Sequence, residues 1–448
     1  MTESGSAVQT ISALQIAKAL NLPSPTAQQV AVIEAPLGHA LVVAGAGSGK
    51  TETMANRVLW LLANRIVRPG EILGLTFTRK AAGELGSRIR LRIEQLARAG
   101  LIDTGPAEGG FDAFESPQVS TYNSFANAIF RDNSLLIGRE SDGAILGAAS
   151  AWQLARSVVI ASRDERLIEL GKRVDDVTKA VLALNAAVSE NIVDSAEVRA
   201  MAAEFGGLID LPPGGNGRYE AVEILGSTVS SLDLLLDLSE QFAEAKRRRG
   251  FVEFSDQVAL ALQIVRSTPR VATELREQFR VVLLDEYQDT SVVQTWLLAE
   301  LFGGSAVVEG SALVEGPALV EEPAVMAVGD PNQSIYGWRG ASAANLESFS
   351  AQFDRNGTAM QFNLATSWRN GHGILAVANA LVEPLLPHTR VNVQKLTAGP
   401  VASDRPVDVT FEETITDEAN SAARWLKKQL SDRNEKGELP TAAMLFRA

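Results

Sequence analysis

The octapeptide Ala44–Thr51, AGAGSGKT, constrains the fold of this chain more than any other segment. It has the form of a phosphate-binding loop, in which glycines let backbone N–H groups turn inward around an anion. The apolar run Leu41-Val42-Val43 precedes the loop and a helical pattern over Thr51–Ala63 follows it, as a strand–loop–helix unit requires. A second apolar run, Val281–Leu284, ends in the acid pair Asp285-Glu286. Together the two segments predict a parallel sheet that binds its ligand at the carboxyl ends of its strands.

Each polar residue of these two segments has a predicted role. Lys50 would reach the β- and γ-phosphates of a nucleoside triphosphate, and the Thr51 hydroxyl would hold Mg²⁺. Asp285 would bind the same ion through water, and Glu286 would polarise an attacking water as general base. Two acids after a strand also occur as a helix N-cap, but the phosphate loop disfavours that alternative. The residues predicted to hold the nucleotide are Ala44, Gly45, Ala46, Gly47, Ser48, Gly49, Lys50, Thr51 and Thr53.

The 448 residues predict two to three domains, and the net charge of −13 argues against a protein that coats nucleic acid. A locally basic groove could still bind one strand. The densest basic run, Lys246–Arg249, is interpreted either as a solvated helix end or as a phosphate contact. The absence of cysteine excludes disulfides, thiolate zinc sites and iron–sulfur clusters. Without a secretory signal pattern or an 18-residue apolar run, the sequence favours a cytoplasmic location and no membrane partner.

A third segment, Val328–Ala341, reads VGDPNQSIYGWRGA. Gln333 is a neutral amide that could sense a γ-phosphate or orient water. Tyr336 and Trp338 are suited to stacking on bases of a single strand. They could instead be core residues, but the flanking turn residues and charges disfavour burial.

Seven segments occur in the order typical of one protein family: PTAQQVAVI, AGAGSGKT, LTFTRKAA, STYNSFA, LLDEYQDT, VGDPNQSIYGWRGA and SWRN. The chain resembles the motor of the UvrD/Rep/PcrA group of superfamily 1 DNA helicases. The wording FSDQ, LLDEYQDTS and GDPNQSIYGWRGAS is most similar to the AdnB-like motors of bacterial helicase–nuclease machines.

This resemblance implies ATP and Mg²⁺ as cofactors and assigns further residues. Gln28 would hydrogen-bond the adenine edge, and Arg369 would join Lys50, Glu286 and Gln333 at the γ-phosphate, unless it is a surface arginine at a helix start. The predicted nucleic-acid contacts are Thr76, Phe77, Thr78 and Ser124 in the groove, Tyr336 and Trp338 on the bases, and Arg339 between the two sites.

The sequence departs from the family pattern at three places. Asn123 stands at a usual histidine, Arg79 replaces a common asparagine, and Ser367-Trp368-Arg369-Asn370 replaces N-Y-R-S. An amide can still donate to a phosphate, Arg79 could add a phosphate contact, and the arginine of the last motif is retained.

The resemblance implies an α/β fold. A RecA-like P-loop domain with a parallel sheet would span 1–135 and 249–360, an all-helical insert 136–248, and a partial second RecA-like lobe 361–448. Helices are expected at 11–22, 79–98, 149–168, 174–191 and 222–249, and further strands at 72–77, 325–328 and 442–446. The six-residue repeat over 304–325 is interpreted as an extended acidic loop rather than as β-helix rungs.

The implied function is an ATP-dependent 3′→5′ helicase or translocase motor that acts on single-stranded DNA and 3′-tailed duplex in repair or recombination. Its place of action would be the bacterial nucleoid, and a second helicase–nuclease subunit could be its partner. The incomplete second lobe predicts a fragment of a longer protein with little unwinding activity alone. Two alternatives stay open, a DNA-stimulated ATPase subunit without unwinding activity and a nucleotide switch without nucleic acid.

Overall fold

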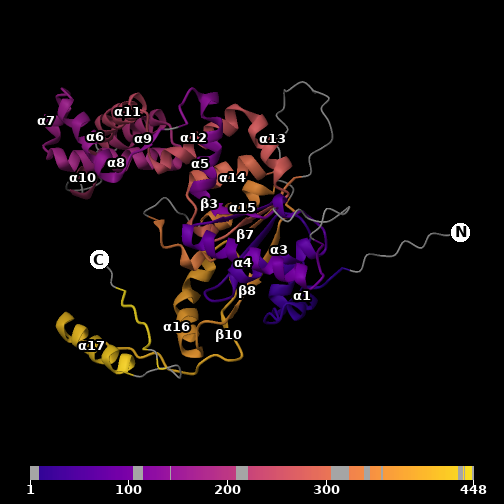
Figure 1. The fold of residues 1–448 in the computed structure, drawn as a ribbon. Helices are drawn as coiled ribbons and strands as arrows, with labels where there is room; N and C mark the ends of the chain where they lie inside the picture. The colour runs from indigo at the N-terminus through magenta and orange to yellow at the C-terminus, as the bar shows by residue number, and fades with distance from the viewer. Residues whose placement is uncertain are drawn as a thin grey trace.

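The computed structural model describes residues 10–103, 115–141, 143–207, 220–303, 322–337, 344–354, 357–431, 437 and 439–445. Its centre is a six-stranded parallel sheet in the order β3-β2-β6-β7-β1-β8 (Figure 1). The strands are β1 Ala40–Ala44, β2 Ile72–Thr76, β3 Gln118–Thr121, β6 Val281–Leu284, β7 Ala324–Gly329 and β8 Met360–Leu364. The predicted α/β class with a parallel sheet is confirmed.

Both faces of the sheet are covered by helices, because successive strand residues point to opposite sides. Leu41 and Val43 of β1 pack into one apolar cluster, and Ala40, Val42 and Ala44 pack into the other. On the first face lie α5 Tyr122–Asn133, α12 Phe254–Ser267, α13 Pro269–Gln278, α14 Val292–Phe302 and α15 Ala344–Phe353. The second face carries α1 Ala13–Ala19, α2 Ala27–Ile33, α3 Lys50–Ala63 and α4 Arg79–Arg98.

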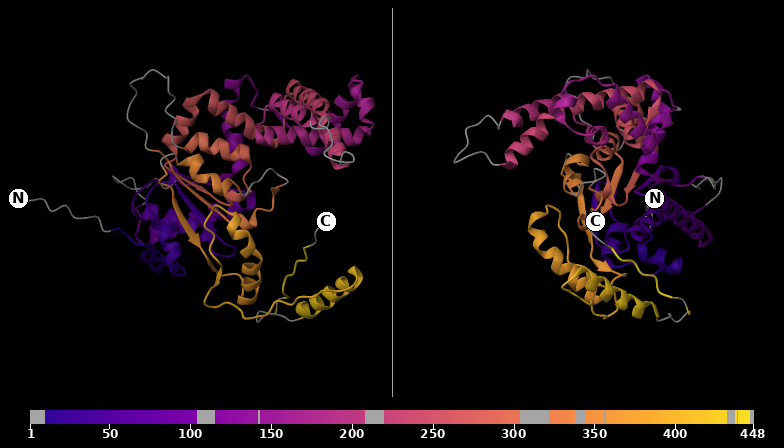
Figure 2. Two further views of the ribbon diagram at one scale, coloured as in Figure 1. Left: turned by 180° about the vertical axis from the view of Figure 1, so that it is seen from behind. Right: turned by 90° about the vertical axis from the view of Figure 1, so that its left-hand side faces the viewer.

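A helical insert lies beside the sheet domain (Figure 2). It contains α6 Ala148–Ala161, α7 Arg166–Leu170, α8 Val174–Asn191, α9 Ser195–Gly207, α10 Glu220–Ser230 and α11 Leu232–Arg248. Its own apolar cluster forms around residues such as Ala155, Val181 and Phe242. A short parallel pair, β4 Ala144–Ile145 with β5 Phe251–Val252, closes the base of the insert where the chain leaves and returns.

Two predicted helices of the insert are each broken in two. The helix expected over 149–168 stops at α6 and resumes as α7, because Ser162 and Asp164 accept hydrogen bonds from backbone N–H groups two residues later. The helix expected over 222–249 is interrupted at Ser231, whose hydroxyl donates to the Thr228 carbonyl.

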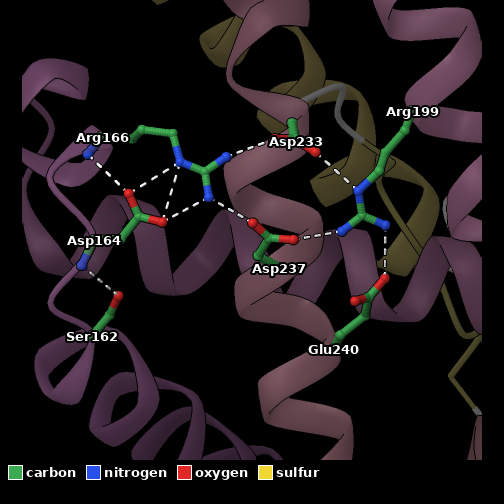
Figure 3. A network of polar contacts seen from close by, with 7 residues as sticks. All are labelled: Ser162, Asp164, Arg166, Arg199, Asp233, Asp237 and Glu240. Atoms are coloured by element: carbon green, nitrogen blue, oxygen red, sulfur yellow. Dashed lines mark hydrogen bonds and ion pairs between the residues drawn. The ribbon is translucent and has the colours of Figure 1, made fainter.

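Charge attaches α7 and α9 to α11, and α7 also packs Leu167 and Leu170 against the apolar cluster of the insert. Neither α7 nor α9 contains a buried residue. Arg166 contacts Asp233 and Asp237 at 2.6 Å, and Arg199 contacts the same two acids at 2.9 and 2.6 Å (Figure 3). Arg199 also contacts Glu240 at 2.9 Å. The guanidinium of Arg166, and then that of Arg199, lower the pKa of Asp237, the acid that both arginines share.

The C-terminal region differs most from the prediction. Residues 361–364, expected to start the second lobe, pair with β1 as part of β8 in the first sheet. A two-stranded sheet, β9 Thr366–Ser367 with β10 Thr397–Ala398, follows together with α16 His372–Val382 and α17 Ile415–Ser431. Residues 442–445 form no strand, so that prediction is wrong for them, and no described strand pairs with them.

Two remaining features bear on the predictions. The repeat region 304–321 and the loop 104–114 lie outside the described residues. Over the part of the chain that the structure describes, no helix combines the length and apolarity needed to cross a membrane.

We expect Asp237→Asn to loosen α7 and α9, because one substitution weakens the ion pairs of both arginines. Amide hydrogen exchange in α7 and α9 should become several-fold faster, whereas exchange in the central sheet should not change. Asp176→Asn is the control, since the one ion pair of Asp176 among the described residues is with nearby Arg173, within α8 and its cap. Unchanged exchange in α9 of the Asp237 variant would mean that the network does not hold this helix.

Candidate nucleotide and nucleic-acid sites

The phosphate loop has the backbone geometry that its sequence predicts. Gly47 and Gly49 have φ angles of 75° and 81°, which only glycine adopts easily. A Cβ atom on Gly47 would lie 2.7 Å from the Arg369 Cβ and 2.8 Å from the Ser367 hydroxyl. The Ser48 hydroxyl is buried without a partner in the described residues. Thr53 donates to the Gly49 carbonyl at 3.0 Å and so stabilises the start of α3.

Lys50 and Glu286 meet although they are distant in sequence. The Lys50 ammonium lies 2.6 Å from a Glu286 carboxylate oxygen. Glu286 has a φ of 49°, an uncommon left-handed conformation that stores backbone strain. The phosphate loop after β1 and the acid pair after β6 therefore converge at the carboxyl edge of the sheet.

Asp285 is a buried acid whose ionised form is disfavoured. Burial, and then the neighbouring charge of Glu286, raise the pKa of Asp285 to about 6, although Lys50 acts in the opposite direction. Its backbone N–H donates to the Leu75 carbonyl at 2.8 Å, which fixes its position against β2. A desolvated carboxylate of this kind fits a divalent cation, because the cation would neutralise its charge.

The donor set suits Mg²⁺ bound together with a triphosphate. The described residues contain no group of three His, Cys, Asp or Glu side chains that could hold a metal alone. Mg²⁺ in nucleotide sites is commonly held by one or two protein oxygens and by phosphate oxygens. Asp285 and Thr51 fit that arrangement.

A hydrogen-bonded chain connects the ends of β6 and β7. Gln288 is buried and donates to Glu286 at 2.9 Å, while its side-chain oxygen accepts from the Asp330 N–H at 3.0 Å. Gln333 donates to the Asp330 carboxylate at 2.6 Å. Sequence reasoning missed Gln288, although it belongs to the DEYQDT segment. The chain links predicted residues Gln333 and Glu286 through Asp330 and Gln288.

Gln29 contacts the phosphate loop, a role that sequence reasoning did not assign to it. The buried Gln29 amide donates to the Ser48 carbonyl at 3.2 Å. Gln28 accepts from the Ala365 N–H and donates to Gln394, and its hydrogen bond to the adenine edge stays a prediction. A capping box between Thr26 and Gln29 at the start of α2 orients Gln29 inward, and this T-x-x-Q signal is readable in the sequence.

The segment that carries Arg369 is tied directly to the phosphate loop. The Trp368 N–H donates to the Gly47 carbonyl at 2.8 Å, and the Ser367 hydroxyl donates to the Ala46 carbonyl at 2.9 Å. The Arg369 side chain is exposed beside Gly47 and forms no ion pair with the described residues. Its guanidinium is therefore available to an anion.

The predicted strand-binding residues are brought together only in part. The rings of Phe77 and Tyr336 stack with centroids 5.1 Å apart, and Thr78 and Ser124 are exposed. Thr76 is fully buried and donates to the Thr78 carbonyl, so the prediction that it lines the groove is not met. Trp338 and Arg339 lie outside the described residues.

Tyr122 joins the strand-binding segment to the acid pair. Its buried hydroxyl donates to the Asp285 carbonyl at 2.8 Å. The next residue, Asn123, accepts from Gln294 at 2.8 Å, so the position that departs from the family pattern is held by α14. Sequence reasoning assigned no role to Tyr122.

Comparison with known proteins is consistent with this geometry. Residues 25–354 match the family described as UvrD/REP helicase N-terminal domain. DNA helicase II of Escherichia coli is 26% identical over 427 residues, which cover 95% of this chain and 49% of that protein. The ATP-dependent DNA helicase UvrD1 of Mycobacterium leprae is 30% identical over 364 residues, which cover 80% of this chain and 39% of that protein.

A third relative, the ATP-dependent DNA helicase PcrA of Leuconostoc citreum, is 27% identical over 355 residues, covering 79% of this chain and 38% of that protein. The chain thus spans about half the length of these curated relatives, or less. None of these relatives is named as an AdnB-like motor, so the resemblance to that subfamily stays a prediction.

We expect Asp285→Asn to stabilise the nucleotide-free protein near neutral pH. The pKa of this acid is raised from about 3.9 in an unfolded chain to about 6 here, so its stabilising effect is present below pH ~4 and is lost as the pH rises through ~6. At neutral pH the variant should gain about 1–3 kcal/mol in the free energy of unfolding. The gain should shrink as the pH falls from ~6 to ~4.

Urea unfolding at several pH values measures this difference, and Asp103→Asn at an exposed acid is the control. The same Asp285 variant should lose the stabilisation that Mg²⁺ and ATP together confer on the original protein. A variant less stable at neutral pH would contradict the interpretation.

Proposed function

The chain belongs to the UvrD/REP helicase family, and on that premise we propose that it is an ATP-driven motor that moves 3′→5′ along single-stranded DNA and opens 3′-tailed duplexes. The observation that carries this proposal is the 2.6 Å contact between Lys50 and Glu286, since it joins the phosphate loop to the acid pair. The direction of movement follows the family resemblance. Because the relatives are bacterial DNA helicases, the proposed place of action is the bacterial chromosome in repair or recombination.

In the nucleotide site, Lys50 neutralises phosphate charge and Glu286 accepts a proton from the attacking water. Mg²⁺, when bound through Asp285 and Thr51, supplies Lewis-acid polarisation of the phosphates. Gln333 orients the reacting groups, and its bond to Asp330 supports this role, because Asp330 is linked through Gln288 to Glu286.

Arg369 completes the charge stabilisation of the transferred phosphoryl group. Its exposed side chain beside the phosphate loop supports this role. The backbone contact of Trp368 with Gly47 supports a further step, in which movement of the second lobe shifts the phosphate loop.

In the strand site, bases stack on Tyr336 and Phe77, and Thr78 and Ser124 contact the backbone. The stacked pair of rings supports this assignment, because flat aromatic faces bind any base. Trp338 and Arg339 belong to the same proposed site. Tyr122 couples the two sites, because it lies between Ser124 and the Asp285 carbonyl.

We propose a two-part RecA-like domain with a helical insert at 136–248, and we place the change to the second lobe after Leu364. A second helicase–nuclease subunit is the proposed partner, on the AdnB-like wording of the sequence. The whole protein would unwind, whereas the chain of 448 residues alone would bind nucleotide and single strands and unwind weakly.

Turnover of ATP with and without a single-stranded oligonucleotide tests the proposal. We expect stimulation by the oligonucleotide, and we expect Lys50→Ala to lower turnover at least about 100-fold because phosphate charge is no longer neutralised. Arg65→Ala, outside both sites, is the control. ATP turnover that is not stimulated by single strands would favour a nucleotide switch. Unchanged turnover in the Lys50 variant would show that the phosphate loop takes no part in the reaction.

We expect Tyr122→Phe to weaken the coupling between the sites. Loss of one hydrogen bond to the buried Asp285 carbonyl should reduce DNA-stimulated turnover about 5- to 10-fold at saturating oligonucleotide. The oligonucleotide concentration that gives half-maximal stimulation should change little. Tyr287→Phe is the matched control, because that equally buried hydroxyl bonds to Gln352 instead. Equal losses in both variants would show a general packing effect.

A further inference from the structure

We propose that the groove at the base of the helical insert binds the phosphodiester backbone of DNA, an inference that rests on the proposed function. The groove has a volume of about 600 Å³ and is lined by Arg139, Arg247, Arg248 and Arg249. It is separate from the strand site at Phe77 and Tyr336, because none of those residues lines it.

The four arginines come from two segments that the fold brings together. Arg139 follows α5, and the other three lie at the end of α11 and directly after it. The pairing of β4 with β5 joins these segments. A Cβ atom on Gly143 would lie only 3.0 Å from the Gly250 carbonyl oxygen, so the two chains approach closely beside the arginines.

Lys246, the first residue of the basic run, is excluded from the groove contact. It is buried, lies 2.9 Å from Asp256, and lies 4.9 Å from the centre of the Phe242 ring. Because this lysine ties the last turn of α11 to the start of α12, it fixes the position of the following arginines. Its role is structural, whereas Arg247, Arg248 and Arg249 are exposed.

The arginines of the groove are not balanced by acids. Arg247 and Arg248 share the single carboxylate of Glu244, and Arg249 only donates to the Ala245 carbonyl. Arg139 forms no ion pair within the described residues, and among those described residues that line the groove Glu140 is the one acid. Among the described residues that line the groove, four arginines therefore accompany one acid, although Arg248 and Arg249 also border a neighbouring groove that contains Asp164, Asp237, Glu240 and Glu244.

The favourable interaction of cations with the helix dipole explains only part of this cluster of four arginines. Cations at the last turn of α11 suit the helix dipole. That effect does not account for Arg139, which belongs to another segment and faces the same groove. A polyanion that contacts both segments accounts for all four residues.

The groove lies within reach of a strand bound at the proposed strand site. Helix α5 starts at Tyr122, beside Asn123 and Ser124, and Phe130 of the same helix lines the groove. Its 12 residues span about 18 Å at 1.5 Å per residue. A few nucleotides cover that length, so one DNA molecule can contact both places.

The test compares the complete 448-residue chain with a triple variant, Arg139→Gln, Arg247→Gln and Arg249→Gln. Fluorescence anisotropy would measure binding of a labelled single-stranded oligonucleotide and of a labelled 3′-tailed duplex over a salt series. We expect the slope of log affinity against log salt to fall by about 2–3, because each lost phosphate contact removes roughly 0.7–0.9. ATP-dependent thermal stabilisation should remain, which shows that the variant is folded.

A pair of single variants separates the groove from a general helix-end effect. Arg248 and Arg98 both lie in the last turn of a helix, both pair with a glutamate four residues earlier, and both side chains are 75% exposed. Arg248→Gln should reduce the salt slope by nearly one, whereas Arg98→Gln should not change it.

The outcomes are distinguishable. A groove that binds single strands predicts a loss on both DNAs, and a groove that binds duplex predicts a loss on the tailed duplex alone. An unchanged slope in the triple variant, with normal binding by the original protein, overturns the groove. Absence of DNA binding by the original protein overturns the proposed function and the groove with it.

Discussion

The contact between Lys50 and Glu286 is the interaction on which the rest of the site depends. Their segments follow β1 and β6, which lie on either side of β7, so the parallel sheet brings the two charges together at its carboxyl edge. The Gln288 side-chain amide donates a hydrogen bond to the same Glu286 carboxylate. A triphosphate bound at this loop, as proposed above, would share or replace the Lys50 contact.

Three other parts of the chain are attached to this pair by short contacts. Gln29 bonds to the phosphate loop, Trp368 bonds to the same loop from the segment after β9, and Tyr122 bonds to Asp285 from the start of α5. In each contact a backbone carbonyl is the acceptor, whereas the donor is a side chain for Gln29 and Tyr122 and the backbone N–H for Trp368. Movement at any of the three places would displace groups that surround the phosphates.

Charged residues serve three distinct purposes in the helical insert. Lys246 is buried and anchors α11, while Arg166 and Arg199 attach helices that have no buried residue. The arginines around Arg248 remain exposed and line a groove. Net charge therefore says little about this region, since seven of its acids take part in ion pairs while several arginines stay exposed.

Local chemistry in the sequence determined the sheet, the phosphate loop and the acid pair, because glycine conformations and apolar runs act over a few residues. The predicted strand Val281–Leu284 and the end of the helix at Ala63 agree with β6 and α3. The tertiary structure alone decided that Thr76 and Lys246 are buried and that residues 361–364 join the first sheet. These outcomes depend on partners far away in the chain, which no local pattern encodes.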